Sequence, residues 1–232
     1  MRNLLFIVLA FLFFSCETEA QQQQITSKPK PSMNTKYLAL GDSYTIGEAV
    51  DSDKNFPNQL VAELRSRGGS IDDPKIIAVT GWTTDELKTA IENDNPTKDY
   101  GFVTLLIGVN NQYRGYEFSQ YEKEFTELLN MAIEFASGDP EKVIVVSIPD
   151  YGVTPFAENS DSDKIARELD QYNSYAKGQA LSKGVTFVDI TGISRLAEFD
   201  PELTASDKLH PSGKMYKLWV DAISPAAFIK IN

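Results

Sequence analysis

The stretch Tyr37-Leu38-Ala39-Leu40-Gly41-Asp42-Ser43-Tyr44 decides the fold of this chain. Its first half is a short, uninterrupted apolar run, which is typical of a strand buried on both faces. Its second half changes to glycine, aspartate and serine, so the strand ends in a polar loop. A serine at the end of a buried strand is one component of a nucleophilic site, although its hydroxyl needs a base to take its proton.

Four further apolar, β-branched runs follow this stretch, with helix-period segments between them. The five runs span residues 37–40, 75–79, 102–107, 142–148 and 185–190. The helical segments span residues 56–67, 84–92, 116–136, 162–182 and 212–227. Continuous apolar strands that alternate with helices indicate a parallel sheet covered on both faces. We therefore predict a three-layer α/β/α domain with a flavodoxin-like, five-stranded parallel sheet.

Chemically suggestive loops follow the first three predicted strands and precede the last helix. They are Gly41-Asp42-Ser43, Thr80-Gly81-Trp82, Gly108-Val109-Asn110-Asn111 and the Asp-x-x-His segment from Asp207 to His210. In open parallel sheets, active sites form in the loops beyond the carboxyl ends of the strands. We expect these four loops to lie on the same edge of the sheet.

His210 is the only histidine of the chain, and Asp207 lies three residues before it. A serine nucleophile needs an imidazole as base, and a carboxylate can orient that imidazole. If Ser43 is a nucleophile, His210 therefore has no competitor as its base. With one histidine, one cysteine and no clustered ligand spacing, we expect no metal. No glycine-rich phosphate loop is present, and we expect no cofactor.

These four blocks resemble those of the SGNH (GDSL-type) hydrolase family in order and in spacing. The resemblance covers residues 37–211 and implies the SGNH hydrolase fold for a domain over residues 36–232. It departs from the family pattern at Tyr44, where the family's older name has leucine, and at Asn111, which replaces the usual aspartate. The second departure leaves the amide donor intact, because that donor is the preceding residue, Asn110.

The resemblance also implies a role for each block residue. Ser43 would be the nucleophile, His210 the base and Asp207 the residue that orients His210. The oxyanion hole would consist of the backbone N–H groups of Ser43 and Gly81 and the side-chain amide of Asn110. Neutral, fixed donors of this kind stabilise the negative charge of a tetrahedral intermediate.

Each of these residues has a purely structural alternative, which the sequence leaves open. Ser43 could be a helix N-cap, and His210 could be a loop histidine bonded to backbone. Asp207 could cap its own turn, and Gly81 and Asn110 could serve turn conformations. We assign a structural role to Asp42, whose carboxylate we expect to bind neighbouring loop amides.

Several flanking residues could line a substrate cleft. Trp82, Tyr113 and Arg114 are compatible with sugar stacking or carboxylate contact, and equally with packing or an ordinary surface position. The loop at residues 149–155 follows the fourth strand, and we expect it to shape the acyl or alcohol pocket.

The activity implied is that of a serine esterase with an acyl-enzyme on Ser43, acting on small-acyl or carbohydrate esters. Three alternatives stay open: a lysophospholipase or thioesterase, an O-acyltransferase on the same triad, and a catalytically idle surface binding module. The intact set of Ser43, Asp207 and His210 argues against the binding module. No large apolar lid interrupts the β-α units, which favours small acyl groups or an open cleft.

The charge of the chain limits its partners. The formal net charge is −11, from 22 basic and 33 acidic side chains. Such a surface repels nucleic acid, so we expect an ester substrate and no nucleic-acid partner. We expect a monomer.

The N-terminal segment predicts export. Arg2 precedes an apolar run from residue 4 to residue 14, which is too short to span a bilayer and is typical of a signal peptide over residues 1–15. Cys16, the only cysteine, follows at once and resembles a bacterial lipoprotein processing site. We expect a lipidated Cys16, a flexible tether over residues 16–35 and a membrane-anchored, exported lipoprotein. Ordinary signal cleavage is the alternative.

Overall fold

The computed structural model describes residues 34–231. The predicted signal peptide at residues 1–15, the predicted lipidation of Cys16 and most of the predicted tether lie outside the described residues. Within them, no helix is both long enough and apolar enough to cross a membrane.

The first two described residues precede the predicted start of the domain, and both contact the segment before the second strand. Thr35 forms a parallel bridge with Ile71, and Asn34 Nδ2 donates to Asp72 Oδ1 over 2.9 Å. These two residues, which we had assigned to the tether, therefore fasten the chain to the segment that precedes the second strand.

Five parallel strands form one sheet in the order β2-β1-β3-β4-β5. The strands are β1 Tyr37–Gly41, β2 Lys75–Ala78, β3 Phe102–Leu106, β4 Val143–Val146 and β5 Thr186–Val188. All neighbouring pairs are parallel, and Gly41 at the end of β1 lies between Ala78 and Leu106. This is the flavodoxin-like order, so the predicted fold class is confirmed. The order reverses between β1 and β3, where such sheets bind ligands.

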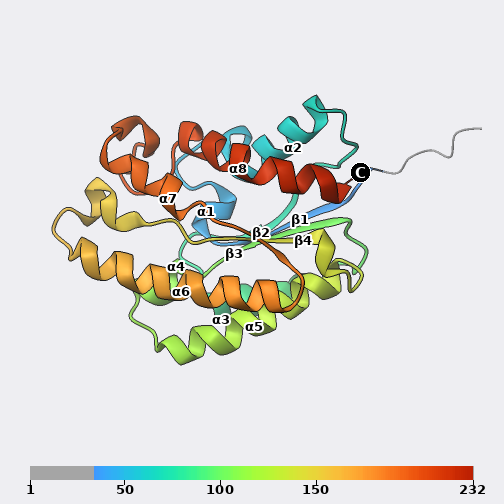
Figure 1. The fold of residues 1–232 in the computed structure, drawn as a ribbon, viewed down its shortest axis with the longest axis horizontal. Coiled ribbons are helices and arrows are strands. Elements are labelled where there is room, and N and C mark those ends of the chain that lie inside the picture. Colours follow the sequence, from blue (N-terminus) through green and yellow to red (C-terminus); the bar gives the residue numbers. More distant parts are fainter. Residues whose placement is uncertain (1–33, 232) are drawn as a thin grey trace, which may run out of the picture. The chain divides into compact units, whose positions relative to one another are not determined.

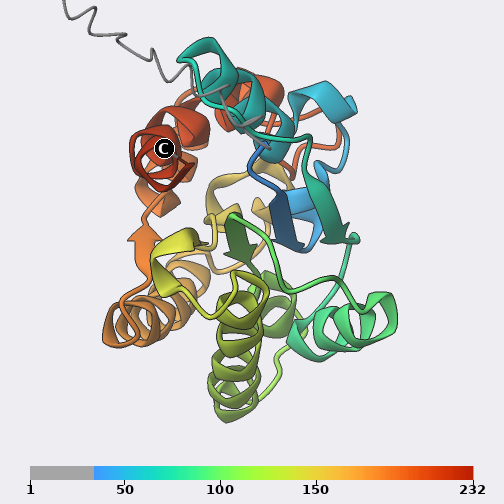
Figure 2. The ribbon, with the colours of Figure 1, turned by 90° about the vertical axis from the view of Figure 1, so that its right-hand side faces the viewer.

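Helices cover both faces of the sheet, as Figure 1 shows. One face carries α2 (Phe56–Ser66) and α8 (Gly213–Ile231). The opposite face carries α3 (Thr84–Asp94), α5 (Phe118–Phe135) and α6 (Ser162–Ser182). Figure 2 shows the same two helical layers from the side, with the sheet between them. All five predicted helices are present, with ends shifted by a few residues.

Short helices that the sequence did not predict occupy the connecting loops. Three are single α-helical turns: α1 Ser43–Ile46, α4 Val109–Tyr113 and α7 Thr191–Ser194. Six are 3-10 turns: η1 Ser52–Lys54, η2 Pro140–Lys142, η3 Tyr151–Val153, η4 Pro155–Ala157, η5 Arg195–Glu198 and η6 Pro201–Leu203. Segments of three to five residues are too short for a 3.6-residue period to be read from the sequence.

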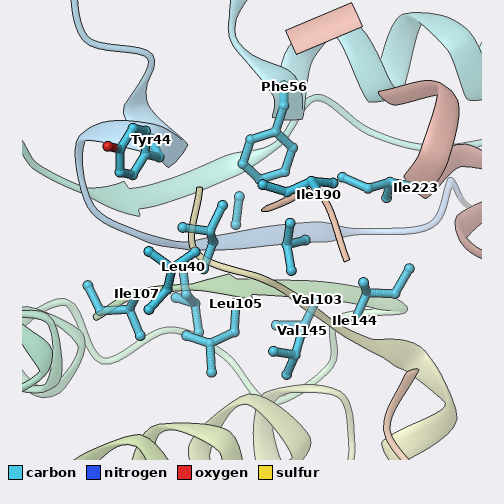
Figure 3. Close-up of a cluster of buried hydrophobic side chains, with 14 of the residues drawn as sticks. Leu40, Tyr44, Phe56, Val103, Leu105, Ile107, Ile144, Val145, Ile190 and Ile223 are labelled. Atoms are coloured by element: carbon cyan, nitrogen blue, oxygen red, sulfur yellow. The ribbon is translucent and has the colours of Figure 1, made fainter. Parts of the chain in front are cut away.

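The core explains why the strands are apolar without alternation. Every residue of β1, β3 and β4 is buried, because helices cover both faces of the sheet. Figure 3 shows strand side chains such as Leu40 and Val145 in one cluster with Phe56 of α2 and Ile223 of α8. Burial of this kind contributes about 25 cal/mol per Å² of apolar surface, and it gives the loops at the carboxyl edge a rigid support.

Candidate active site

The candidate nucleophile lies at the point where β1 ends. Asp42 is the N-cap of α1 and its Oδ1 accepts the Tyr44 N–H over 3.0 Å, so the N-cap role left open for Ser43 belongs to Asp42. Ser43 is the first helical residue, so its own N–H has no acceptor inside the helix. Its side chain is nearly buried, at 4% exposed.

Only glycine fits immediately before this loop. A Cβ at Gly41 would lie 2.1 Å from Thr45 Oγ1 and 2.4 Å from the Leu106 carbonyl oxygen. The one-turn helix α1 therefore folds directly back onto the end of β1, and this close return holds Ser43 at the sheet edge.

The candidate base and its carboxylate form a compact turn. His210 Nδ1–H donates to Asp207 Oδ2 over 2.5 Å. Asp207 Oδ1 accepts the backbone N–H groups of Leu209 and His210, each over 3.0 Å. Asp207 thus caps its own turn and orients the imidazole at the same time. With Nδ1 committed to Asp207, Nε2 of the neutral ring is left as an acceptor.

Electrostatics favour an ionised Asp207. Partial burial raises the pKa of its carboxyl, but the hydrogen bonds from the His210 ring and from the two backbone amides outweigh this and hold that pKa below its usual range. The His210 side chain is 9% exposed, and the centroid of its ring lies 5.6 Å from that of Tyr44.

Four of the five predicted site residues line one cavity of about 140 Å³: Ser43, Gly81, Asn110 and His210. Asp207 lies behind the imidazole, in contact with His210 rather than with the cavity. These residues come from four loops that are far apart in the sequence, and the sheet brings those loops together at its carboxyl edge.

The candidate oxyanion donors lie on neighbouring loops. Gly81 follows β2 with φ +88°, a conformation that side chains with a Cβ rarely adopt. Asn110 Nδ2 donates to the Trp82 carbonyl oxygen over 2.9 Å. An amide nitrogen carries two hydrogens, so this bond orients the Asn110 amide and leaves one N–H for a ligand.

Asn111 takes a structural role in place of the family's usual aspartate. Its Oδ1 accepts the Thr84 N–H over 3.0 Å, and its Nδ2 donates to Thr84 Oγ1 over 2.7 Å. The side chain therefore joins α4 to the first turn of α3, and it does not line the cavity.

Asp42 has the structural role predicted for it, with an electrostatic cost. Its carboxyl is fully buried, and burial raises its pKa to about 7 even though the Tyr44 amide lowers it. Within residues 34–231, Asp42 Oδ2 has no hydrogen-bond partner.

An aromatic wall borders the cavity, and we define it as Tyr113, Tyr151 and Phe156. Tyr113 lies edge-on to Tyr151, with ring centroids 5.9 Å apart, and 6.1 Å from Phe156. Tyr113 and Phe156 are 57% and 47% exposed. Tyr151 belongs to the 149–155 loop that is expected to shape the pocket, and Phe156 directly follows that loop.

Hydrogen bonds fix the loop that carries this wall. Asp150 Oδ1 accepts the Gly152 N–H over 2.8 Å, and its Oδ2 accepts Arg195 Nε over 2.9 Å. Phe156 N–H donates to the Lys208 carbonyl oxygen over 3.1 Å, which ties the wall to the turn of His210.

Two other flanking residues lie outside the cavity lining. Trp82 contributes its carbonyl to Asn110 and packs against the core. Arg114 donates from Nη2 to the Gly81 carbonyl oxygen over 2.5 Å. Nothing in the sequence distinguished these roles from a role in substrate contact. Among the described residues, no group of three or more His, Cys, Asp or Glu side chains is arranged to hold a metal ion.

Known proteins resemble this chain in sequence and in fold. An acetylxylan esterase from Geobacillus stearothermophilus is 26% identical over 141 residues, which are 58% of this chain and 62% of that protein. The match therefore spans less than two thirds of that relative's length.

Solved structures share the fold. A variant of an acetyl xylan esterase from Geobacillus stearothermophilus has a TM-score of 0.64 at 20% identity, over 84% of this chain and 96% of that chain. A lipase/acylhydrolase from Enterococcus faecalis has a TM-score of 0.64 at 16% identity, over 85% and 97%. At these identities the likeness establishes the fold alone.

The family is established by a match along most of the chain. The model of the GDSL-like lipase/acylhydrolase family matches residues 39–218, which include all four of the loops at the sheet edge. The chain belongs to the GDSL-like lipase/acylhydrolase family of ester hydrolases.

Proposed function

We propose that this protein is a serine esterase that forms an acyl-enzyme on Ser43. The observation that carries the proposal is that Ser43 and His210 line one cavity while Asp207 holds the His210 ring through Nδ1. His210 Nε2 takes the hydroxyl proton as Ser43 Oγ attacks the ester carbonyl carbon. The carbonyl oxygen of the ester then becomes an oxyanion. His210 then gives that proton to the departing alcohol.

The second half of the reaction uses the same groups. His210 takes a proton from water, the resulting hydroxide attacks the acyl carbon, and the acid leaves as Ser43 recovers its proton. In both halves three N–H groups donate hydrogen bonds to the oxyanion. They are the backbone N–H groups of Ser43 and Gly81 and the free side-chain N–H of Asn110.

The size of the cavity supports small acyl groups. Its volume is about 140 Å³, well below the roughly 300–1,000 Å³ of pockets for drug-sized ligands. A neighbouring cavity, which is also lined by Tyr44 and Tyr151, has a volume of only about 20 Å³. A long acyl chain finds no continuous groove there, which disfavours the lysophospholipase alternative.

The aromatic wall supports a carbohydrate alcohol. Exposed faces of Tyr113 and Phe156 offer apolar area to a flat or ring-shaped group at the cavity mouth. The similarity to an acetylxylan esterase points the same way. We therefore propose short-chain esters of sugars, such as acetylated xylooligosaccharides, as the substrate class.

One experiment tests the activity and a second tests the substrate class. A fluorophosphonate should label the wild type and not Ser43→Ala, and absence of labelling in the wild type would refute the acyl-enzyme. In a series of chromogenic esters, kcat/KM should fall beyond about four carbons. A groove for a long chain would instead raise kcat/KM about fourfold for each added methylene, because each buried CH₂ contributes ~0.8 kcal/mol.

Product analysis completes the assignment. With an acetylated xylooligosaccharide, we expect free acetate as the product, and transfer of acetyl to added sugar would indicate an acyltransferase. Tyr113→Ala should raise KM for that oligosaccharide about fivefold, as expected for loss of roughly 1 kcal/mol of aromatic contact. The matched control is Phe199→Ala, which removes an exposed aromatic side chain outside the cavity lining.

For the cellular location we propose an exported lipoprotein anchored through Cys16. The apolar run before Cys16 and the absence of another cysteine support this. Labelled fatty acid should be incorporated by the full chain in a bacterial host and not by Cys16→Ser. Release of an unlabelled wild type into the soluble fraction would indicate ordinary signal cleavage.

A further inference from the structure

Arg114 is a cation next to the active site that takes no part in the mechanism above. It ends α4, four residues after Asn110, and its Nη2 donates to the Gly81 carbonyl oxygen over 2.5 Å. Its Nη1 lies 3.4 Å from a carboxylate oxygen of Glu86. The side chain therefore runs from one candidate oxyanion loop to the other.

The Arg114 bond is one of three connections between the same two segments. Asn110 Nδ2 donates to the Trp82 carbonyl oxygen, and Asn111 binds both the N–H and the hydroxyl of Thr84. Helix α4 thus holds residues on either side of Trp82. Of the three connections, the Arg114 bond is the one made to Gly81 itself.

Gly81 has little packing around it to hold its conformation. Its φ is +88°, and a Cβ built on it would meet, within 4 Å, only Arg114 Nη2 at 3.6 Å. Glycine loses more backbone freedom on ordering than any other residue. Apart from Arg114, no side chain contacts the position that its Cβ would occupy, so packing there does little to fix its dihedral angles.

Glu86 in turn orients Arg114. Its Oε2 accepts the Thr83 N–H over 2.9 Å, in the capping box that begins α3. Bonding to the Thr83 amide is the main cause that lowers the pKa of Glu86, with Arg114 adding to it, so the carboxylate is ionised beside the guanidinium. Both side chains are more than a third exposed, and the ion pair itself contributes little to stability.

We propose that Arg114 is a positioning residue, which fixes the Gly81 N–H for the oxyanion by holding the Gly81 carbonyl. This rests on the proposed function, because it assigns the Gly81 N–H to the oxyanion hole. A donor stabilises a transition state fully only when it is already oriented before the charge develops. A guanidinium suits this task better than an ammonium, since its planar N–H groups reach Gly81 and Glu86 together.

The kinetic test compares Arg114→Ala with Arg167→Ala, an exposed arginine on α6 that serves as the matched control. We expect kcat to fall about 10-fold in Arg114→Ala with KM within twofold, a smaller loss than the roughly 10²–10³ for a deleted donor in Asn110→Ala. Added guanidinium at non-denaturing concentration should recover part of the kcat, because the site is exposed to solvent. Arg114→Lys should lie between wild type and alanine.

A second readout does not depend on activity. The ¹⁵N order parameter of the Gly81 amide should fall in Arg114→Ala and stay unchanged in Arg167→Ala, with the melting temperature of both variants close to wild type. A Gly81 amide as rigid as in the wild type, or a mobile amide with an unchanged kcat, would overturn the proposal. A wild type without fluorophosphonate labelling would refute the proposed esterase, while the order parameters would still decide whether Arg114 holds Gly81.

Discussion

The two loops that supply the candidate nucleophile and the candidate base are built in opposite ways. Ser43 depends on the core: it follows a buried strand, and the chain returns so closely that only glycine fits at position 41. His210 depends on its own turn, in which Asp207 binds the ring and two backbone amides. A nucleophile is thus held by packing and a base by local hydrogen bonds. Mutations in the Ser43 loop should therefore lower stability first, whereas mutations in the His210 turn should lower kcat first.

The two loops also place their carboxylates in different environments. Asp42 is fully buried and has a pKa raised to about 7. Asp207 is partly exposed and has a pKa lowered by the imidazole and the amides around it. Asp42 supports the nucleophile loop although burial disfavours its ionised form. The ionised form of Asp207 is instead stabilised by its hydrogen bonds.

The largest expected effect tests whether the loops act as one unit. Ser43→Ala and His210→Ala should each lower kcat by as much as about 10⁶-fold, and the double variant should lose almost nothing more, because the two groups act in a single proton transfer. Steady-state kinetics on a chromogenic acetate measures this. If the loss of kcat in the double variant equalled the product of the two single losses, the two loops would contribute separately.

Breaking the local turn should give the next largest effect. Asp207→Asn keeps the shape but removes the charge and leaves the His210 tautomer poorly held, so kcat should fall by about 10⁴-fold. The fold should survive, as judged by circular dichroism. A variant with near wild-type kcat would leave Asp207 as a simple turn cap.

Breaking the packed loop should instead appear first in stability. In Gly41→Ala the new Cβ meets Thr45 Oγ1 and a backbone oxygen, and overpacking of this kind costs about 1–3 kcal/mol or more of unfolding free energy. Gly178→Ala is the control, since a Cβ on this helical glycine of α6 meets nothing within 4 Å. It should be neutral or slightly stabilising. Urea unfolding of both variants decides, and equal stability would place the support of Ser43 elsewhere.

The pH dependence of stability should have opposite signs for the two carboxylates. The unfolded chain ionises Asp42 near its ordinary value of 3.8 and the folded chain near 7, so the unfolded state binds fewer protons between these values. The contribution of Asp42 to stability should therefore fall as pH rises from about 4 to 7. Asp42→Asn should flatten that part of the profile.

The contribution of Asp207 should run the other way. Its folded pKa is lowered, so its stabilising effect is complete above the ordinary value and is lost as pH falls through the folded pKa. The difference in unfolding free energy between wild type and Asp207→Asn should shrink below about pH 4. A constant difference down to low pH would contradict the stabilisation of the ionised Asp207 carboxylate by the hydrogen bonds of its turn.

The sequence predicted the features that depend on periodicity and order. The five strands, the five long helices and the flavodoxin-like sheet follow from apolar runs such as that of Tyr37 to Leu40, because burial on both faces leaves a continuous pattern. The grouping of Ser43, Gly81, Asn110 and His210 around one cavity followed from the rule that strand ends meet at one edge.

The remainder depends on three-dimensional contacts that leave no pattern in the sequence. The one-turn helix α4 is too short to show a period, and Arg114, the residue directly after it, reaches Gly81 across 33 positions of sequence. Phe156 lines the cavity because its N–H binds the Lys208 carbonyl. Such partners become visible only when the loops are seen together.

The bridge between Thr35 and Ile71 has a consequence for how the enzyme meets its substrate. It secures the chain at the amino end of β1, whereas Ser43 lies beyond the carboxyl end of that strand. At ~3.3 Å per residue, the strand alone separates the two points by roughly 15 Å. The chain therefore enters the sheet at the end opposite the mouth of the cavity. A polymeric substrate at that mouth does not meet the first residues of the domain.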